Sequence, residues 1–581
     1  MRTFLPAANE DRMTTVTPPE EIPEGPGNNM LERLERLVRE RSDLIAVVAL
    51  LVSLVPRLAE AATTYLNPDE ANYFLHSMPS GLTELYRSAI SFTHHPPLAV
   101  MLIRAATDLI GPNELSLRLA FVISGALFPW FVYRWLALVW NRVAGLLALL
   151  LLAFAPHLIS LSAQARGYTV SFLAIAACLY YLERALERDS VRSIAVSAVA
   201  LWIGILAEYC VAYFAAAAGI YFLLRVGKQR PSRRLLAAWA LGQAGGVALY
   251  GLLAVTHVLP MLDSPRNQDS LQGWLHGGFP WPGDNMVVFL ALATLKQFAY
   301  LMASIPLGVV AVVPFLAGLW LFWNGCSPKE RTRSRCLIPL VLLPFLIAAS
   351  ASLAHVHPYG RSRHTALLGI LIAITIAAAL ERAIRSRAWI VLPAAILLIP
   401  VWQWVSIEDQ NNISRNRHNR EIMRAAVDHL RETVPVGALI LTEGDLRLSL
   451  RYYLGLAEGS WPIPPRGPNR EWRDRYRMVV VKERVNNTDD LAKAVTELRA
   501  AYGLDSSEPI WFAEGGWDPM ISVPPGKDGL QPLTTRFGTV LRLFRVPGGF
   551  ALHAAELEAG QRSLSPDKRD RLDEGGIDPK R

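Results

Sequence analysis

Residues Val143–Leu161 read VAGLLALLLLAFAPHLISL, a stretch with no polar face at any helical spacing. Residues Thr365–Leu380 read TALLGILIAITIAAAL and have the same character. A helix that packs on the core of a soluble protein keeps a polar outer face, which neither stretch provides. A helix needs roughly 20 apolar residues to cross the hydrocarbon of a bilayer. The two stretches therefore predict membrane-spanning helices.

Comparable runs fill the middle of the 581-residue chain, in which hydrophobic residues make up 52% and charged residues 19%. Charge is concentrated in residues 1–43 and after Glu408. About eleven runs approach the spanning length, the shortest being the fifth, sixth and tenth. They lie near 43–60, 117–139, 143–160, 168–184, 191–207, 209–225, 235–258, 300–323, 337–354, 365–381 and 388–406. The sequence predicts a polytopic α-helical membrane protein with its transmembrane domain at 43–406.

The placement of Lys and Arg predicts the orientation of the chain. Cytoplasmic loops carry an excess of these residues, and alternate loops here are basic. The basic loops contain Arg134 and Arg142; Arg184, Arg188 and Arg192; Arg225, Lys228, Arg230, Arg233 and Arg234; Lys329, Arg331, Arg333 and Arg335; and Arg382, Arg385 and Arg387. We expect a cytoplasmic polar segment at 1–42, a first apolar run that stays as an anchor, and a C-terminal domain outside the cytoplasm in a cell (inner) membrane. The net charge of +8 reflects this bias and does not indicate a nucleic-acid partner.

Two predicted external loops are much longer than the others, at about 61–116 and about 259–299. Within the first, apolar residues recur at helical spacing in Leu98–Ile110, and the preceding Pro96 and Pro97 suit a helix start. We expect two helices lying along the outer membrane surface in this loop. A long external loop that packs back on the bundle can build a site at the bilayer edge.

The first loop also holds two groups of titratable residues. In YLNPDEANYF, Asp69 and Glu70 are adjacent acids just outside the first span. Such a pair holds a divalent metal or accepts a proton from an attacking hydroxyl, or it is an ordinary pair of solvated carboxylates. His94 and His95 precede the paired prolines and are either metal ligands or hydrogen-bonding residues at the helix start.

Later external turns supply further candidates. In LSAQARGYTV, Arg166 suits an anionic group at headgroup depth, or else acts with Tyr168 as an interfacial anchor. Glu208 lies in the short turn AEYC between two apolar runs, where ionisable groups are costly and often functional. Arg361 and Arg363 in HVHPYGRSRHT either bind a lipid phosphate or snorkel to the interface.

In combination these motifs resemble the GT-C superfamily of membrane glycosyltransferases. The resemblance is strongest to the bacterial branch related to protein O-mannosyltransferases and to the aminoarabinose transferases of lipid A. The motifs are PDEANY in the first loop, HPPL after it, GPNELSLRL leading into the second span, QARGY opening the fourth and GRSRHT late in the chain. The resemblance covers about residues 43–406.

The resemblance implies a sugar transfer at the outer membrane face from a polyprenyl-phosphate donor, in cell-envelope lipid, polysaccharide or protein glycosylation. The acceptor is then a lipid, a glycan or a protein. By the motif, Asp69 is the catalytic residue with Glu70 beside it, often working with a divalent ion such as Mg, Mn or Zn. Arg166, Arg361 and Arg363 bind the donor phosphate. His94, His95, Tyr168 and Glu208 are supporting candidates.

The remainder of the chain alternates helical and strand patterns. Helical patterns begin at Arg420, Leu446 and Asp489, and strand patterns include ALILTEG, RMVVVK, PIWFAEG and TVLRLFRV. This alternation predicts an extracytoplasmic α/β sandwich with a partly parallel sheet over 407–555. The charged tail at 556–581 has the composition of a disordered segment. No Gly-rich phosphate loop is present, so we expect an accessory role for the domain.

A polytopic transporter or lipid flippase would also have many spans and buried charges. Such proteins more often show repeated halves and helices broken by Gly or Pro, and no internal repeat is visible here. A non-catalytic scaffold would give no reason for PDE and HPPL to share one loop.

Overall fold

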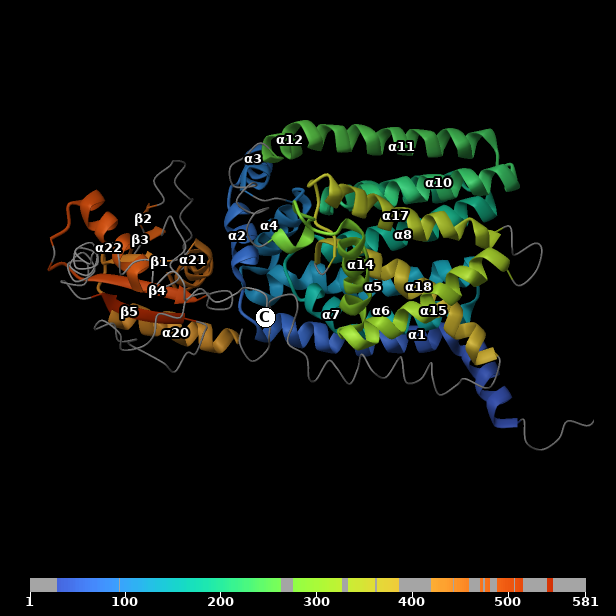
Figure 1. The fold of residues 1–581 in the computed structure, drawn as a ribbon, viewed down its shortest axis with the longest axis horizontal. Helices are drawn as coiled ribbons and strands as arrows, with labels where there is room; N and C mark the ends of the chain where they lie inside the picture. The colour runs from blue at the N-terminus through green and yellow to red at the C-terminus, as the bar shows by residue number, and fades with distance from the viewer. Residues whose placement is uncertain are drawn as a thin grey trace, which may run out of the picture.

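The computed structural model describes residues 29–92, 95–262, 275–325, 333–360, 363–385, 419–442, 444–458, 471–473, 476–480, 488–505, 507–515 and 541–546. Figure 1 shows a bundle of long helices with a smaller α/β domain against one end. The bundle helices are α1 (Asn29–Thr63), α5 (Glu114–Val139), α6 (Arg142–Phe154), α7 (Pro156–Ser162), α8 (Tyr168–Arg188), α9 (Val191–Ala207), α10 (Val211–Gln229), α11 (Arg233–Leu253), α14 (Met286–Met302), α15 (Ile305–Asn324), α17 (Leu337–Leu353) and α18 (Leu368–Arg385).

The helical bundle confirms the predicted polytopic membrane protein. Within the described residues, seven helices are long and apolar enough to cross a membrane, or eight if the bent pair α6–α7 is one span. The predicted count of about eleven is larger for three reasons. Helix α9 is a shorter apolar helix, α18 carries charges in its last turns at Glu381 and Arg382, and the run at 388–406 lies outside the described residues.

The run predicted at 143–160 is broken into two helices. Helices α6 and α7 are bent by 63° at the residues between them. Pro156 has no N–H to donate and disfavours a helical conformation at the residue before it. Ala155 accordingly has an extended backbone, with φ −61° and ψ 120°. The bend leads the chain into the turn at Arg166.

The first external loop contains three short helices where two were predicted: α2 (Pro68–His76), α3 (Leu82–Phe92) and α4 (Leu98–Ile110). The motif PDEANYF is therefore helical. Exposed apolar side chains occur on the other two helices, with Leu82 79% and Leu109 83% exposed. An apolar surface at the end of the bundle agrees with helices that lie at the membrane interface.

The second predicted loop, at about 259–299, is only partly a loop. Helix α11 continues through the π-helix η1 (Ala254–Val258) into α12 (Leu259–Leu262), and η2 (His276–Gly278) follows later. Residues 286–302 form α14, which packs against α15. The sequence did not predict α14 because Lys296 and Gln297 interrupt its apolar pattern.

The C-terminal domain is an α/β sandwich around one mixed sheet, which confirms the predicted partly parallel sheet. The strands are β1 (Leu439–Thr442), β2 (Glu471–Arg473), β3 (Arg477–Val480), β4 (Ile510–Gly515) and β5 (Leu541–Val546), in the order β2-β3-β1-β4-β5. Strand β1 is parallel to β3 and β4, and the two edge strands are antiparallel. Helices α20 (Arg420–Thr433) and α21 (Gly444–Glu458) cover one face and α22 (Thr488–Tyr502) covers the other.

The C-terminal domain docks on the first external loop. One hydrophobic cluster contains Phe74 and Leu75 of α2 together with Leu450 and Tyr452 of α21. The ring of Phe74 meets that of Tyr452 edge to face, with centroids 5.0 Å apart. The domain and α2 therefore share one end of the bundle, as Figure 1 shows.

Candidate active site

Helix α2 starts with a reciprocal cap that separates the two predicted acidic residues. The Asn67 side chain accepts a hydrogen bond from the Glu70 N–H, and the Glu70 carboxylate accepts one from the Asn67 N–H, at 3.0 and 3.1 Å. Pro68 occupies the first helical position, where its missing N–H costs nothing. Successive helical side chains point roughly 100° apart, so Asp69 and Glu70 face different surroundings.

Asp69 faces two arginines that come from distant parts of the chain. Arg166, in the turn between α7 and α8, donates from Nη1 to Asp69 Oδ2. Arg363, in the 3-10 turn η3 (Arg363–Thr365), donates from Nη2 to the same oxygen at 2.7 Å. The Asp69 side chain is 35% exposed. Its other oxygen, Oδ1, has no hydrogen-bond partner among the residues that the structure describes.

His95 and Glu208 extend this cluster behind Arg166. Arg166 Nη2 lies 2.8 Å from His95 Nε2, and His95 Nδ1 lies 3.0 Å from Glu208 Oε2. Because an arginine only donates, Nε2 accepts and Nδ1 carries the hydrogen that Glu208 accepts. Glu208 is 5% exposed and follows the last residue of α9 in an extended conformation. The chain Glu208–His95–Arg166–Asp69 fixes the orientation of the Arg166 guanidinium.

Aromatic rings surround the cluster. The Arg166 guanidinium lies over the rings of Tyr73 and Tyr168, at 5.7 and 5.1 Å from their centroids. The His95 ring meets the Tyr168 ring edge to face and stacks parallel to that of His364, with centroids 5.7 and 6.1 Å apart. These walls limit water around the charges and strengthen their interaction.

The surrounding charges determine the ionisation of Asp69. Burial acts to raise the pKa of Asp69, but the charges of Arg166 and Arg363 act against it, and the net effect lowers the pKa. Asp69 is therefore a carboxylate at neutral pH. Desolvation acts to lower the pKa of Arg166, but Asp69 and neighbouring groups raise it overall, so Arg166 stays charged. Desolvation and the nearby cations lower the pKa of His364 well below its ordinary value, so that ring is neutral.

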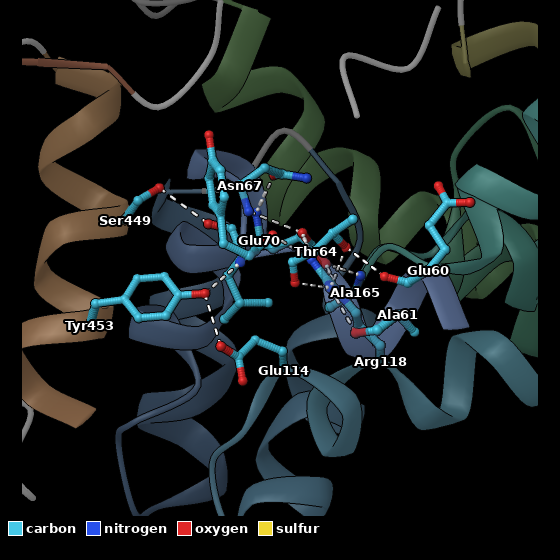
Figure 2. A network of polar contacts seen from close by, with 12 residues as sticks. Glu60, Ala61, Thr64, Asn67, Glu70, Glu114, Arg118, Ala165, Ser449 and Tyr453 are labelled. Carbon is cyan, nitrogen blue, oxygen red and sulfur yellow. Dashed lines mark hydrogen bonds and ion pairs between the residues drawn. The ribbon is translucent and has the colours of Figure 1, made fainter. Parts of the chain in front are cut away.

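Glu70, predicted beside Asp69 as a catalytic residue, lies in a different network (Figure 2). It is fully buried and pairs with Arg118 of α5, whose Nε and Nη2 donate to its two oxygens at 2.7 and 2.6 Å. The N–H groups of Ala165 and Asn67 supply one further hydrogen bond to each oxygen. Four donors thus fill the Glu70 carboxylate. Removing one member of a fully buried ion pair typically costs about 3–5 kcal/mol, so this arrangement favours an anchoring role.

Two of the predicted site residues, His94 and Arg361, lie outside the described residues. Their predicted roles remain predictions. The structure brings Asp69, Arg166, Arg363, His95, Tyr168 and Glu208 together, although they come from five separate segments of the chain.

The described residues do not by themselves form a complete site for a divalent metal ion. Among the described residues there is no group of three or more His, Cys, Asp or Glu side chains placed to hold a metal. Asp69 Oδ2 already accepts hydrogen bonds from two guanidinium cations, so Oδ1 is the Asp69 oxygen left for a ligand. A metal cation at Asp69 would be repelled by both guanidinium groups.

The sequence analysis missed the residues that support Asp69 from a distance. Arg118 lies within an apolar run at 117–139, and a buried cation in such a run was the available signal. Glu114, one helical turn earlier, is also fully buried. Tyr453 of the C-terminal domain gave no signal, since a tyrosine in an amphipathic helix is ordinary.

Comparisons with known proteins bear on the membrane domain and on the whole fold. A family model described as dolichyl-phosphate-mannose-protein mannosyltransferase matches residues 94–257, a range that includes His95, Arg166 and Glu208. The chain is similar to the crystal structure of ArnT from Cupriavidus metallidurans in the apo state. It is 14% identical to that chain, with 87% of this chain and 98% of that chain covered and a TM-score of 0.50.

A second solved structure with a similar arrangement is the Archaeoglobus fulgidus oligosaccharyltransferase in the apo form. The identity is 12%, the coverage is 82% of this chain and 69% of that chain, and the TM-score is 0.48. No curated protein matches this chain by sequence. The family match is confined to part of the membrane domain, and the likeness to ArnT shows that the two chains share a fold.

Proposed function

We propose that this protein transfers a sugar from a polyprenyl-phosphate donor to an acceptor hydroxyl at the extracytoplasmic face of the membrane. One observation carries the proposal: Asp69 lies beside the cations Arg166 and Arg363 at the end of a membrane bundle. A transferase of this kind needs a base for the acceptor and cations for the departing phosphate. The family model that matches part of the chain is itself described by a dolichyl-phosphate sugar.

The two arginines are the proposed donor-phosphate site. Guanidinium groups match phosphate oxygens geometrically and keep their charge at any physiological pH. Arg166 is held from behind by His95 and sits between two tyrosine rings. Arg363 approaches from a separate turn. A phosphate placed between them would be held from two directions.

Asp69 is the proposed base. Its oxygen Oδ1 accepts the proton of the acceptor hydroxyl as the acceptor oxygen attacks the anomeric carbon of the sugar. The bond between that carbon and the phosphate oxygen breaks, and the electron pair leaves with the polyprenyl phosphate. The guanidinium charges stabilise the negative charge that develops there. Asp69 is left protonated and returns its proton to water.

Donor binding strengthens Asp69 as a base in this scheme. In the structure both arginines donate to Asp69 Oδ2, which makes the carboxylate a weak base. A bound phosphate competes for the same N–H groups and neutralises part of the cationic charge. The carboxylate becomes more basic when the donor is in place, which discourages proton uptake by Asp69 before the donor binds.

The basic loops and the position of the site support the proposed orientation. Arg225 and Arg333 from two of the basic loops converge on the buried Glu183, within a region of the bundle distinct from the Asp69 cluster. Positive loops favour the cytoplasmic side. We therefore propose that Asp69 and the C-terminal domain lie outside the cytoplasm, in a cell membrane.

A transferase breaks the sugar–phosphate bond of the donor, whereas a lipid flippase leaves it intact. Purified protein in liposomes, supplied with a radiolabelled polyprenyl-phosphate sugar and candidate acceptors, should release free polyprenyl phosphate and a labelled product. A flippase would move the donor across the bilayer with its sugar–phosphate bond intact. Transbilayer movement without cleavage, across a panel of lipid, glycan and peptide acceptors, would exclude the proposed activity.

A further inference from the structure

The peptide that precedes α2 is held by the C-terminal domain. Both backbone polar groups of Leu66 bond to side chains of α21: its N–H donates to Tyr453 Oη at 3.0 Å, and its carbonyl accepts from Ser449 Oγ at 3.2 Å. Leu66 is fully buried. A buried backbone group without a partner costs free energy, so the position of this peptide depends on α21.

Tyr453 also links α21 to the bundle. Its hydroxyl donates to Glu114 Oε1 at 3.0 Å, while the other oxygen of Glu114 accepts from Arg424 of α20 at 2.7 Å. Glu114 and Tyr453 are both at most 2% exposed. Figure 2 shows Tyr453 and Ser449 reaching from α21 toward the segment that ends at Asn67. One hydroxyl therefore joins α5, α21 and the start of α2.

The opposite side of the same segment is held by α5. Arg118 Nη1 donates to the carbonyls of Ala61 and Thr64, both at 2.9 Å, and Nη2 donates to the carbonyl of Tyr65 at 2.8 Å. The segment from Ala61 to Leu66 is thus clamped between Arg118 and α21. Asp69 follows Leu66 by three residues, through the cap residue Asn67 and the rigid Pro68.

We infer that Tyr453 of the C-terminal domain is a positioning residue for Asp69, and that the domain is part of the catalytic unit. The inference rests on the proposed function of Asp69. Apolar contact between α2 and α21 is non-directional, whereas the Tyr453 and Ser449 hydrogen bonds fix the Leu66 peptide in one place. The arginines that face Asp69 come from other segments, and His95 and Tyr168, which contact Arg166, also lie outside α2. Movement of α2 would therefore displace the base more than the phosphate site.

Substituting Tyr453→Phe tests the inference, because it removes one oxygen and keeps the ring. A misplacement of about 1 Å can cost up to a hundredfold in rate, so we expect kcat for sugar transfer to fall about tenfold or more. The KM for the donor should change less than about twofold, since Arg166 and Arg363 are untouched. The control is Tyr502→Phe in α22, which covers the other face of the sheet and should keep the wild-type kcat.

A second variant covers the case in which Tyr453→Phe fails to reach the membrane. Ser449→Ala removes only the weaker bond to the Leu66 carbonyl, and it should lower kcat in the same direction with donor KM unchanged. The inference would be overturned if Ser449→Ala kept the wild-type kcat while Tyr453→Phe either kept it as well or was obtained in poor yield. A rise in donor KM equal to the fall in kcat would also overturn it, because it would indicate general disruption.

Asp69→Asn, measured in parallel, distinguishes a failure of the proposed base role of Asp69 from a failure of the positioning role of Tyr453. Loss of transfer in Asp69→Asn with an unaffected Tyr453→Phe contradicts only the positioning role. Ordinary transfer by Asp69→Asn contradicts the proposed function itself.

Discussion

Asp69 and Glu70 are neighbours in the chain with different chemistry. Asp69 is partly exposed and one of its oxygens meets two guanidinium groups, whereas Glu70 is fully buried with both oxygens filled by donors. The helix start at Pro68 produces the difference, because it points the two side chains in different directions. We therefore assign the proposed catalytic role to Asp69 and not to Glu70.

The ionisation of Asp69 should depend on whether the donor is bound. In the free protein burial acts to raise the pKa of Asp69, but Arg166 and Arg363 lower it overall. The acid limb of kcat/KM reports the free enzyme and the acid limb of kcat reports the donor complex. A bound phosphate draws the guanidinium charges away, so the pKa rises in the complex. We expect the limb of kcat at a higher pH than that of kcat/KM, measured as initial rates of transfer over an acidic pH series.

The proposed phosphate contacts predict the behaviour of the arginine variants. Arg166→Ala and Arg363→Ala should each raise the donor KM, because a charge-assisted hydrogen bond contributes about 1.5–3 kcal/mol. Arg134→Ala is a suitable control: Arg134 of α5 pairs with Asp43 of α1 and is not part of the Asp69 cluster. Donor titrations compare the three variants. Saturation at wild-type donor concentrations in both site variants would reduce Arg166 and Arg363 to interfacial anchors.

For single residues, the sequence indicated which polar groups lie at the ends of spans. It did not indicate which of these groups contact one another. Asp69, Arg166, Arg363 and Glu208 were candidates because charges at membrane level are costly. Their grouping could not be derived from spacing, since Arg363 meets Asp69 across 294 positions of the chain. The buried pair of Arg118 and Glu70 depends on the same long-range packing.

At the element scale, α2 is a short helix whose start sets the active site. Asn67→Ala removes a cap worth about 1 kcal/mol and frees the first turn that carries Asp69. We expect a lower kcat together with a modest loss of thermal stability. Asn141→Ala is the matched control, because Asn141 caps α6 with a similar side-chain bond and is not part of the Asp69 cluster. Equal activity of the two variants at equal stability would contradict a special role for the α2 cap.

The elements that sequence analysis predicted best were the long apolar helices. The predictions were wrong where a proline or a polar residue interrupts an apolar run, because the effect of such a residue depends on its packing. Pro156 divides a run that is apolar throughout, and Lys296 and Gln297 conceal α14. In α14, Gln297 is buried and its amide donates to Thr365 Oγ1 at 2.6 Å, a partner that the local sequence does not reveal.

At the scale of the whole molecule, the C-terminal domain and the first loop form one structure. The sequence predicted the α/β sandwich from its alternating patterns, but it gave no indication of the docking surface on α2. The joint depends on Glu114, Tyr453 and Leu66, which are brought together from positions more than 330 residues apart. Contacts of that range are a property of the assembled fold.

The basic loops predict the side of the membrane on which this assembly lies. A reporter that is active only in the cytoplasm, fused after Arg581, should be silent, while the same reporter fused in the basic loop between α10 and α11 should be active. Activity of the C-terminal fusion would place the Asp69 site on the cytoplasmic side. That result would contradict the proposal that sugar transfer takes place at the extracytoplasmic face.

The most direct test of the central claim is the transfer rate of Asp69→Asn. Asparagine is nearly the size of aspartate but lacks its charge and basicity. Transfer from a radiolabelled polyprenyl-phosphate sugar is measured in membranes, with the amount of protein matched by immunoblot. We expect Asp69→Asn to insert at close to the wild-type level and to transfer no measurable sugar. Transfer at an ordinary rate would show that Asp69 is only a loop carboxylate and would contradict the account.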